Sequence, residues 1–181
     1  SPKTVTDPHA WQNIANGRIY VKNIAKALSA ADHVNAATYT ARAEALDMEL
    51  AGLDTWVKNE IGKVPQAKRK VISSHDAFGY FAAAYQVTFL APVGISTEAE
   101  PSAKGMKKLV EQIKQNGVKA IFFENMASAK LVNQLAAEAG VTVGPALYAD
   151  ALSPADGPAP TYQAMFKYNV VELVKAMLLN K

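Results

Sequence analysis

Two histidines and one aspartate carry the clearest chemical signal in this sequence. His9 stands in the motif Asp-Pro-His-Ala-Trp, while His75 and Asp150 each follow a short apolar run. Imidazole nitrogen and carboxylate oxygen together form a ligand set that suits Zn²⁺ and, less exclusively, Mn²⁺ or Fe²⁺. The sequence contains no Cys, so a metal site here must use these ligands. Three protein ligands would leave the fourth position of a tetrahedral ion to water or to a residue outside this chain.

Each of these residues also has a purely structural interpretation. A histidine after a strand could cap the next helix, and an aspartate there often caps a turn. Because Pro8 restricts the residue before it to extended backbone, Asp7 or His9 could approach the free amides at the start of the first predicted helix. The third histidine, His33, lies in a polar turn between two predicted helices, and we predict that it is exposed.

Two further carboxylates follow predicted strands and could orient the imidazoles from behind. Asp76 comes directly after His75, and Glu124 follows the third predicted strand. Metal-binding histidines usually donate their second ring N–H to such a partner. Glu124 could equally form an ion pair or a hydrogen bond with a nearby loop.

Alternating helices and strands must position these residues. Two amphipathic patterns with apolar residues three and four apart predict helices at 11–29 and 39–61. On the first helix the apolar face consists of Ile14, Gly17, Val21, Ile24 and Leu28. We predict strands at 71–73, 87–91, 120–123 and 142–147, and further helices at 76–85, 102–116, 128–139 and 162–179.

This alternation predicts an α/β fold, with a four-stranded parallel sheet covered by helices on both faces and preceded by a long helix. In open parallel sheets, ligands bind outside the carboxyl ends of the strands. His75, Glu124 and Asp150 each follow such an end, so we expect them at one edge of the sheet.

Composition excludes several other classes of function. The formal charge is only +3, from 19 basic and 16 acidic residues, and the one dense basic cluster, at 68–70, has no interleaved aromatic residues. Nucleic-acid binding would need a broader basic face. No stretch approaches the roughly 20 apolar residues of a membrane span, and the N-terminus has no recognisable signal peptide.

Six motifs in order resemble the metal-binding solute-binding proteins of ABC importers, the zinc and manganese group called cluster A-I. They lie at 7–11, 74–81, 98–102, 123–125, 147–153 and 162–169. The resemblance implies two α/β lobes joined by one helix, with a metal held between them by four side chains. It implies that His9, His75 and Asp150 are three of these ligands and that Glu124 supports the site without binding the metal. Some relatives carry Glu at the position of His75, often those that handle manganese, so the imidazole favours zinc.

The resemblance also implies a function without catalysis, namely capture of Zn²⁺ or Mn²⁺ in the periplasm and delivery to an ABC permease. Residues 1–31 would form a His-bearing loop and the joining helix at 11–29, and residues 32–181 the C-terminal metal-binding lobe. The family's N-terminal lobe is absent from the chain. We therefore expect a C-terminal portion that binds metal weakly alone and could associate through an exposed half-cleft.

Two other functions use the same residues differently. A metal-dependent hydrolase would activate water on the ion, with Glu124 as the base. However, the sequence has no nucleophile elbow, HExxH helix or phosphate-binding loop. The second alternative is a metal-free α/β interaction domain, which elemental analysis of the purified protein would distinguish from both.

Overall fold

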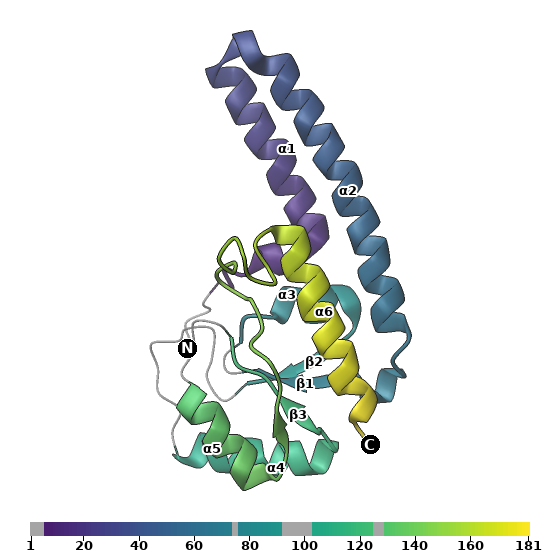
Figure 1. The fold of residues 1–181 in the computed structure, drawn as a ribbon, viewed down its shortest axis with the longest axis vertical. Coiled ribbons are helices and arrows are strands. Elements are labelled where there is room, and N and C mark those ends of the chain that lie inside the picture. Colours follow the sequence, from purple (N-terminus) through teal and green to yellow (C-terminus); the bar gives the residue numbers. More distant parts are fainter. Residues whose placement is uncertain (1–5, 74–75, 92–102, 125–128) are drawn as a thin grey trace.

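The computed structural model of the chain describes residues 6–73, 76–91, 103–124 and 129–181. In Figure 1 a hairpin of two long helices extends away from a small sheet, and the last helix lies along the lower part of the second. The elements in chain order are η1 (Ala10–Gln12), α1 (Ile14–Ala31), η2 (His33–Asn35), α2 (Ala36–Gly62), η3 (Gln66–Lys68), β1 (Lys70–Ile72), α3 (Gly79–Tyr85), β2 (Thr88–Leu90), α4 (Ala103–Asn116), β3 (Ala120–Ile121), α5 (Ala129–Ala139), β4 (Thr142–Val143) and α6 (Tyr162–Leu179).

The sheet has four parallel strands in the order β2-β1-β3-β4, which confirms the predicted fold class. From β1 the chain passes to β2 on one side and then crosses to β3 on the other side. The strand order therefore reverses between β1 and β3. A crevice at such a switch point, outside the carboxyl ends, is where doubly wound sheets bind ligands.

Helices cover both faces of the sheet because neighbouring strand residues point to opposite sides. Val71 and Ala120 belong to one buried core with residues of α2, α3 and α6. Ile72 and Ile121, the next residue of each strand, belong to a second core with residues of α4 and α5. In the described part of the chain, no helix is both long and apolar enough to cross a membrane.

The helical hairpin is packed at its base and open towards its tip. Ile14 and Gly17 are buried, whereas Ile24 and Leu28 are 59% and 44% exposed. The apolar face predicted for this helix is therefore covered only over its first turns, because α6 and the sheet do not reach further (Figure 1). α1 lies along α2 as a hairpin. The predicted boundary after residue 31, between a linker helix and a C-terminal lobe, stays a prediction.

Most predicted element boundaries agree with the structure to within a few residues. Gly117 and Gly140, each with a positive φ, follow α4 and α5. The predicted strand at 142–147 is shorter, since β4 stops at Val143. The next residues are Gly144 and then a proline, which has no N–H for a sheet hydrogen bond. Pairing resumes only as an isolated parallel bridge between Glu124 and Leu147.

Candidate metal centre

His9 is buried between two carboxylates from distant parts of the chain. Its backbone N–H donates to Asp7 Oδ1 at 2.9 Å, and its ring Nδ1 lies 2.7 Å from the same oxygen. On the other side of the ring, Nε2 lies 3.4 Å from Asp150 Oδ1. The His9 side chain is 5% exposed, against 25% for Asp7 and 33% for Asp150. The imidazole is thus enclosed, while solvent reaches both carboxylates.

This arrangement selects which ring nitrogen of His9 can bind a metal. Nδ1 lies within hydrogen-bond distance of Asp7 Oδ1, and a carboxylate only accepts hydrogen bonds, so a metal-binding His9 would carry its ring proton on Nδ1. Nε2, which faces Asp150, would then be the nitrogen whose lone pair binds the metal. A carboxylate behind the ring is the usual partner of a metal-binding histidine.

The spacing of the two candidate ligand atoms matches that of a tetrahedral ion. Bonds of about 2.0–2.1 Å at a tetrahedral angle hold two ligand atoms roughly 3.3 Å apart. The separation between His9 Nε2 and Asp150 Oδ1 is 3.4 Å. Two carboxylates beside one imidazole also favour a divalent cation electrostatically. The pair can therefore act as two ligands of one ion.

The residue that caps α1 differs from the residues predicted to lie at its first amides. Asn13 is the residue that caps α1, because its side chain accepts from the backbone N–H of Ala15 at 2.9 Å. The expectation that Asp7 or His9 approaches the first amides of that helix is therefore wrong. An extra 3₁₀ turn, η1, separates His9 from α1, so Asp7 is available to bond His9 instead.

The segment that carries Asp150 is bound to α6 by a buried amide. Asn169, only 3% exposed, donates from Nδ2 to the carbonyl of Tyr148 at 2.7 Å. Its Oδ1 accepts from the backbone N–H of the same tyrosine at 3.0 Å. The side chain thus replaces a strand neighbour where regular pairing has ended.

The same helix also holds the segment that carries His9. The hydroxyl of Tyr162 donates to the carbonyl of Trp11 at 2.6 Å, and burial raises the pKa of Tyr162, so the hydroxyl remains a donor. Its oxygen lies 2.8 Å from where a Cβ on Gly17 would stand. The absence of a side chain at Gly17 therefore allows this contact.

Of the remaining predicted site residues, Glu124 and Asp76 lie within the described part of the chain and His75 does not. Glu124 is 1% exposed and lies just beyond β3, Asp76 is exposed, and their supporting role stays a prediction. His75 lies outside the described residues, so its place as a ligand also stays a prediction. Among the residues that the structure describes, no group of three or more potential ligands comes together.

Sequence reasoning missed the specific roles of Asp7, Asn169 and Gly79. A Cβ on Gly79 would stand 2.9 Å from Asp7 Oδ2, so the missing side chain leaves space for that carboxylate. The spacing Asp-x-His could have indicated the Asp7 contact. A buried amide at Asn169 is recognisable only once the fold is known. His33 is exposed, as predicted.

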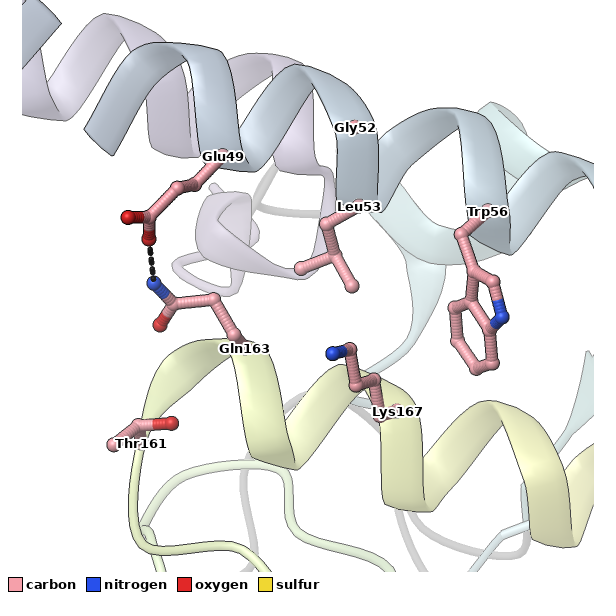
Figure 2. A pocket seen from close by; sticks show the side chains of 7 residues that line it. All are labelled: Glu49, Gly52, Leu53, Trp56, Thr161, Gln163 and Lys167. Carbon is pink, nitrogen blue, oxygen red and sulfur yellow. Dashed lines mark hydrogen bonds between the residues drawn. The ribbon is translucent and has the colours of Figure 1, made fainter. Parts of the chain in front are cut away.

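A groove between α2 and α6 lies apart from these ligands (Figure 2). Its volume is about 630 Å³, and a hydrogen bond of 3.2 Å between Gln163 and Glu49 joins the two helices across it. Its lining residues are Glu49, Gly52, Leu53, Trp56, Thr161, Gln163 and Lys167. None of the predicted metal ligands is among them, so we do not assign the metal to this groove.

Known proteins resemble this chain along nearly its whole length. A family model described as zinc-uptake complex component A, periplasmic, matches residues 2–176. The manganese ABC transporter substrate-binding lipoprotein PsaA of Streptococcus pneumoniae is 31% identical over 171 residues, which are 94% of this chain and 55% of PsaA. The iron-binding protein YfeA of Yersinia pestis is 31% identical over 173 residues, 94% of this chain and 55% of YfeA.

A solved structure agrees with the fold as well. The periplasmic zinc-binding protein TroA from Treponema pallidum superimposes with a TM-score of 0.93 at 30% identity, covering 98% of this chain and 66% of TroA. The chain spans about half the length of the curated relatives that it matches. From its sequence and its fold, the chain belongs to the family of the periplasmic zinc-uptake component A, the metal-binding substrate-binding proteins of ABC importers known as cluster A-I.

Proposed function

We propose that this chain forms part of a protein that captures a divalent transition metal outside the cytoplasm and delivers it to an ABC permease. The metal is cargo, held by His9, His75 and Asp150, with Asp7, Glu124 and Asp76 behind the ligands. Zinc is favoured and manganese is the alternative. Delivery needs no chemistry on the metal, only a site that binds and then releases it.

One observation carries this proposal. The Nδ1 of His9 faces Asp7 at 2.7 Å while its Nε2 faces Asp150 at 3.4 Å. A carboxylate on each side, with spacing suited to tetrahedral coordination, is what a metal ligand and its outer partner require.

The family supports the metal class but leaves the metal open, since its members are named for zinc, manganese and iron. Ligand type favours zinc because two imidazoles and one carboxylate form a set that zinc commonly uses. The periplasm as location and the permease as partner are carried over from these relatives. Association through the exposed half-cleft is also part of the proposal.

Competitive calorimetry with zinc and manganese tests the proposal directly. We expect the 181-residue chain to bind zinc weakly at neutral pH and manganese more weakly, and His75→Ala to lose most of the zinc binding. His33→Ala, which removes an exposed histidine, is the matched control and should bind as the unchanged chain does. An absence of binding to either ion, by this chain and by the protein extended to its relatives' length, would refute metal capture. Zinc-dependent turnover of an ester that Glu124→Gln abolishes would favour the hydrolase.

A further inference from the structure

The carbonyl oxygen of Ala149 accepts two side-chain hydrogen bonds from the segment that follows His9. Trp11 donates from Nε1 at 3.0 Å, and Gln12 donates from Nε2 at 3.1 Å. Ala149 directly precedes Asp150 in the sequence. The two donors therefore connect the residues next to one candidate ligand with the residue next to the other.

These bonds close a small ring of contacts around the candidate centre. From His9 the chain turns through η1 to the two donors, since the backbone N–H of Gln12 donates to the His9 carbonyl at 3.0 Å. From Ala149 the next residue is Asp150, whose carboxylate faces the His9 ring. Each step is one hydrogen bond or a few residues long, so the position of one ligand fixes that of the other.

We call Trp11, Gln12 and the Ala149 carbonyl the clamp. Its bond from Gln12 is buried and that from the half-buried Trp11 is partly buried, and buried bonds are stronger than exposed ones. Gln12 is 1% exposed and Ala149 is 2% exposed. In such surroundings water cannot replace a lost donor, and the carbonyl would remain unsatisfied or would move. The Trp11 ring further packs edge-on against the His9 imidazole, with ring centroids 5.4 Å apart.

We propose that Trp11 and Gln12 are positioning residues that set the distance between His9 and Asp150 and so favour small divalent ions over large ones. This inference rests on the proposed function. Neither residue touches the metal. The separation of 3.4 Å between the two ligand atoms suits bonds of about 2.0–2.1 Å, as in tetrahedral zinc. A larger ion needs the ligands further apart, and the clamp opposes that movement.

Comparing zinc with cadmium tests the clamp, because the two ions have the same charge and filled d shell but different size. Calorimetry on the 181-residue chain would measure both affinities for the unchanged chain and for the double variant Trp11→Phe with Gln12→Met. Phenylalanine retains an aromatic ring and methionine is close to glutamine in size, but neither has a side-chain N–H to donate to the Ala149 carbonyl. We expect zinc affinity to fall about 10- to 100-fold, as on removal of outer-shell partners, and cadmium affinity to fall several-fold less.

A matched control and two single variants make the result decisive. Asn16→Ala removes a 3.0 Å bond from Asn16 to the Ala10 carbonyl, also within the segment after His9, without touching Ala149, and should keep the zinc-to-cadmium ratio. If the double variant does not fold, Gln12→Met and Trp11→Phe, each retaining one donor, should shift the ratio in the same direction. Equal losses for both ions, or none, would overturn the inference while leaving metal capture intact. Failure of the unchanged chain to bind zinc would count against the proposed function instead.

Discussion

At each end of the parallel sheet a buried asparagine side chain binds backbone groups, but only the carboxyl end carries candidate metal ligands. At the amino end, Asn180 donates to the carbonyls of Lys68 and Lys70, each at 2.8 Å, and accepts from the N–H of Lys119 at 3.0 Å. At the carboxyl end, Asn169 makes two bonds to the backbone of Tyr148. Both amides are buried; Asn169 lies within α6, and Asn180 directly follows the last residue of that helix.

Beyond these amides the two ends differ in chemistry. The anchor at the amino end consists of neutral groups that satisfy one another. The carboxyl end adds an imidazole, His9, with the carboxylates of Asp7 and Asp150 around it. Stability and metal binding should therefore depend on different ends of the sheet, and substitutions at the amino end should affect stability alone.

The largest effect should come from removing the buried histidine. We expect His9→Ala to weaken zinc binding about 100-fold or more, which is about 2.7 kcal/mol of binding free energy. The loss follows because both the ligand atom and the contact to Asp7 disappear. Calorimetry against His33→Ala supplies the comparison, and similar affinities for the two variants would remove His9 from the site.

The buried Asn169, within α6, and the buried Asn180, directly after it, allow the two ends of the sheet to be compared with the same substitution. We expect Asn169→Leu and Asn180→Leu each to lower the free energy of unfolding by about 2–4 kcal/mol, because each leaves buried backbone groups unsatisfied. Only Asn169→Leu should also weaken zinc binding, since Tyr148 is two residues before Asp150. Urea unfolding and calorimetry would measure the two quantities. Equal zinc affinities for both variants would show that the carboxyl-end loop is not positioned by Asn169.

A smaller and more local effect is expected at Gly79. A Cβ there would meet Asp7 Oδ2 at 2.9 Å, and this oxygen is at the end of a side chain that can move. Gly79→Ala should therefore leave stability within about 1 kcal/mol, since alanine also favours the helix. It should lower zinc affinity about 10-fold by displacing the partner of His9. Unchanged affinity would mean that Asp7 does not orient the imidazole.

The smallest effect should appear in acid, at the helical hairpin. The Asn35 side chain, followed by the Tyr39 hydroxyl, lowers the pKa of Asp32, and the Arg18 guanidinium lowers the pKa of Asp47. A carboxyl group whose pKa is lower in the folded state stabilises the fold above its unfolded pKa of about 4, and this contribution is lost as pH falls through the folded value.

Thermal unfolding between pH 5 and pH 2.5 measures this contribution. Asp47→Asn should show a shallower loss of stability with falling pH than the unchanged chain. The uncharged Asn180→Leu should leave the slope as it is, because the amino-end anchor does not titrate. If Asp47→Asn has the unchanged slope, the Arg18 ion pair does not contribute to folding.

Sequence periodicity predicted the fold because its signals are local. The pattern of apolar residues three and four apart located α1 and α2, and Gly117 and Gly140 marked the ends of two helices. The exposed part of the α1 face could not be predicted, since periodicity shows which residues share a face and not what covers it. β4 stops early at Gly144 and the proline after it, a local signal within the strand predicted at 142–147, and α3 begins at Gly79 rather than at residue 76.

The proximity of His9 and Asp150 was predictable from the sequence, whereas the contacts that support these two residues were not. Their role as metal ligands stays a prediction. His9 and Asp150 were expected from residue type, motif and strand ends, and the structure brings these two together. The bonds of Trp11 and Gln12 to Ala149 join residues more than 130 positions apart. Such contacts leave no local pattern in the sequence, because any buried donor of suitable length could make them.

The central claim is that one metal ion bridges His9 and Asp150. X-ray diffraction at the zinc absorption edge, from crystals of the chain grown with one equivalent of zinc, tests this claim most directly. We expect one anomalous peak within about 2.0–2.2 Å of both His9 Nε2 and an Asp150 carboxylate oxygen, with His9 Nδ1 still bonded to Asp7. A zinc ion bound at Nδ1, or bound only at exposed groups such as His33, would contradict it.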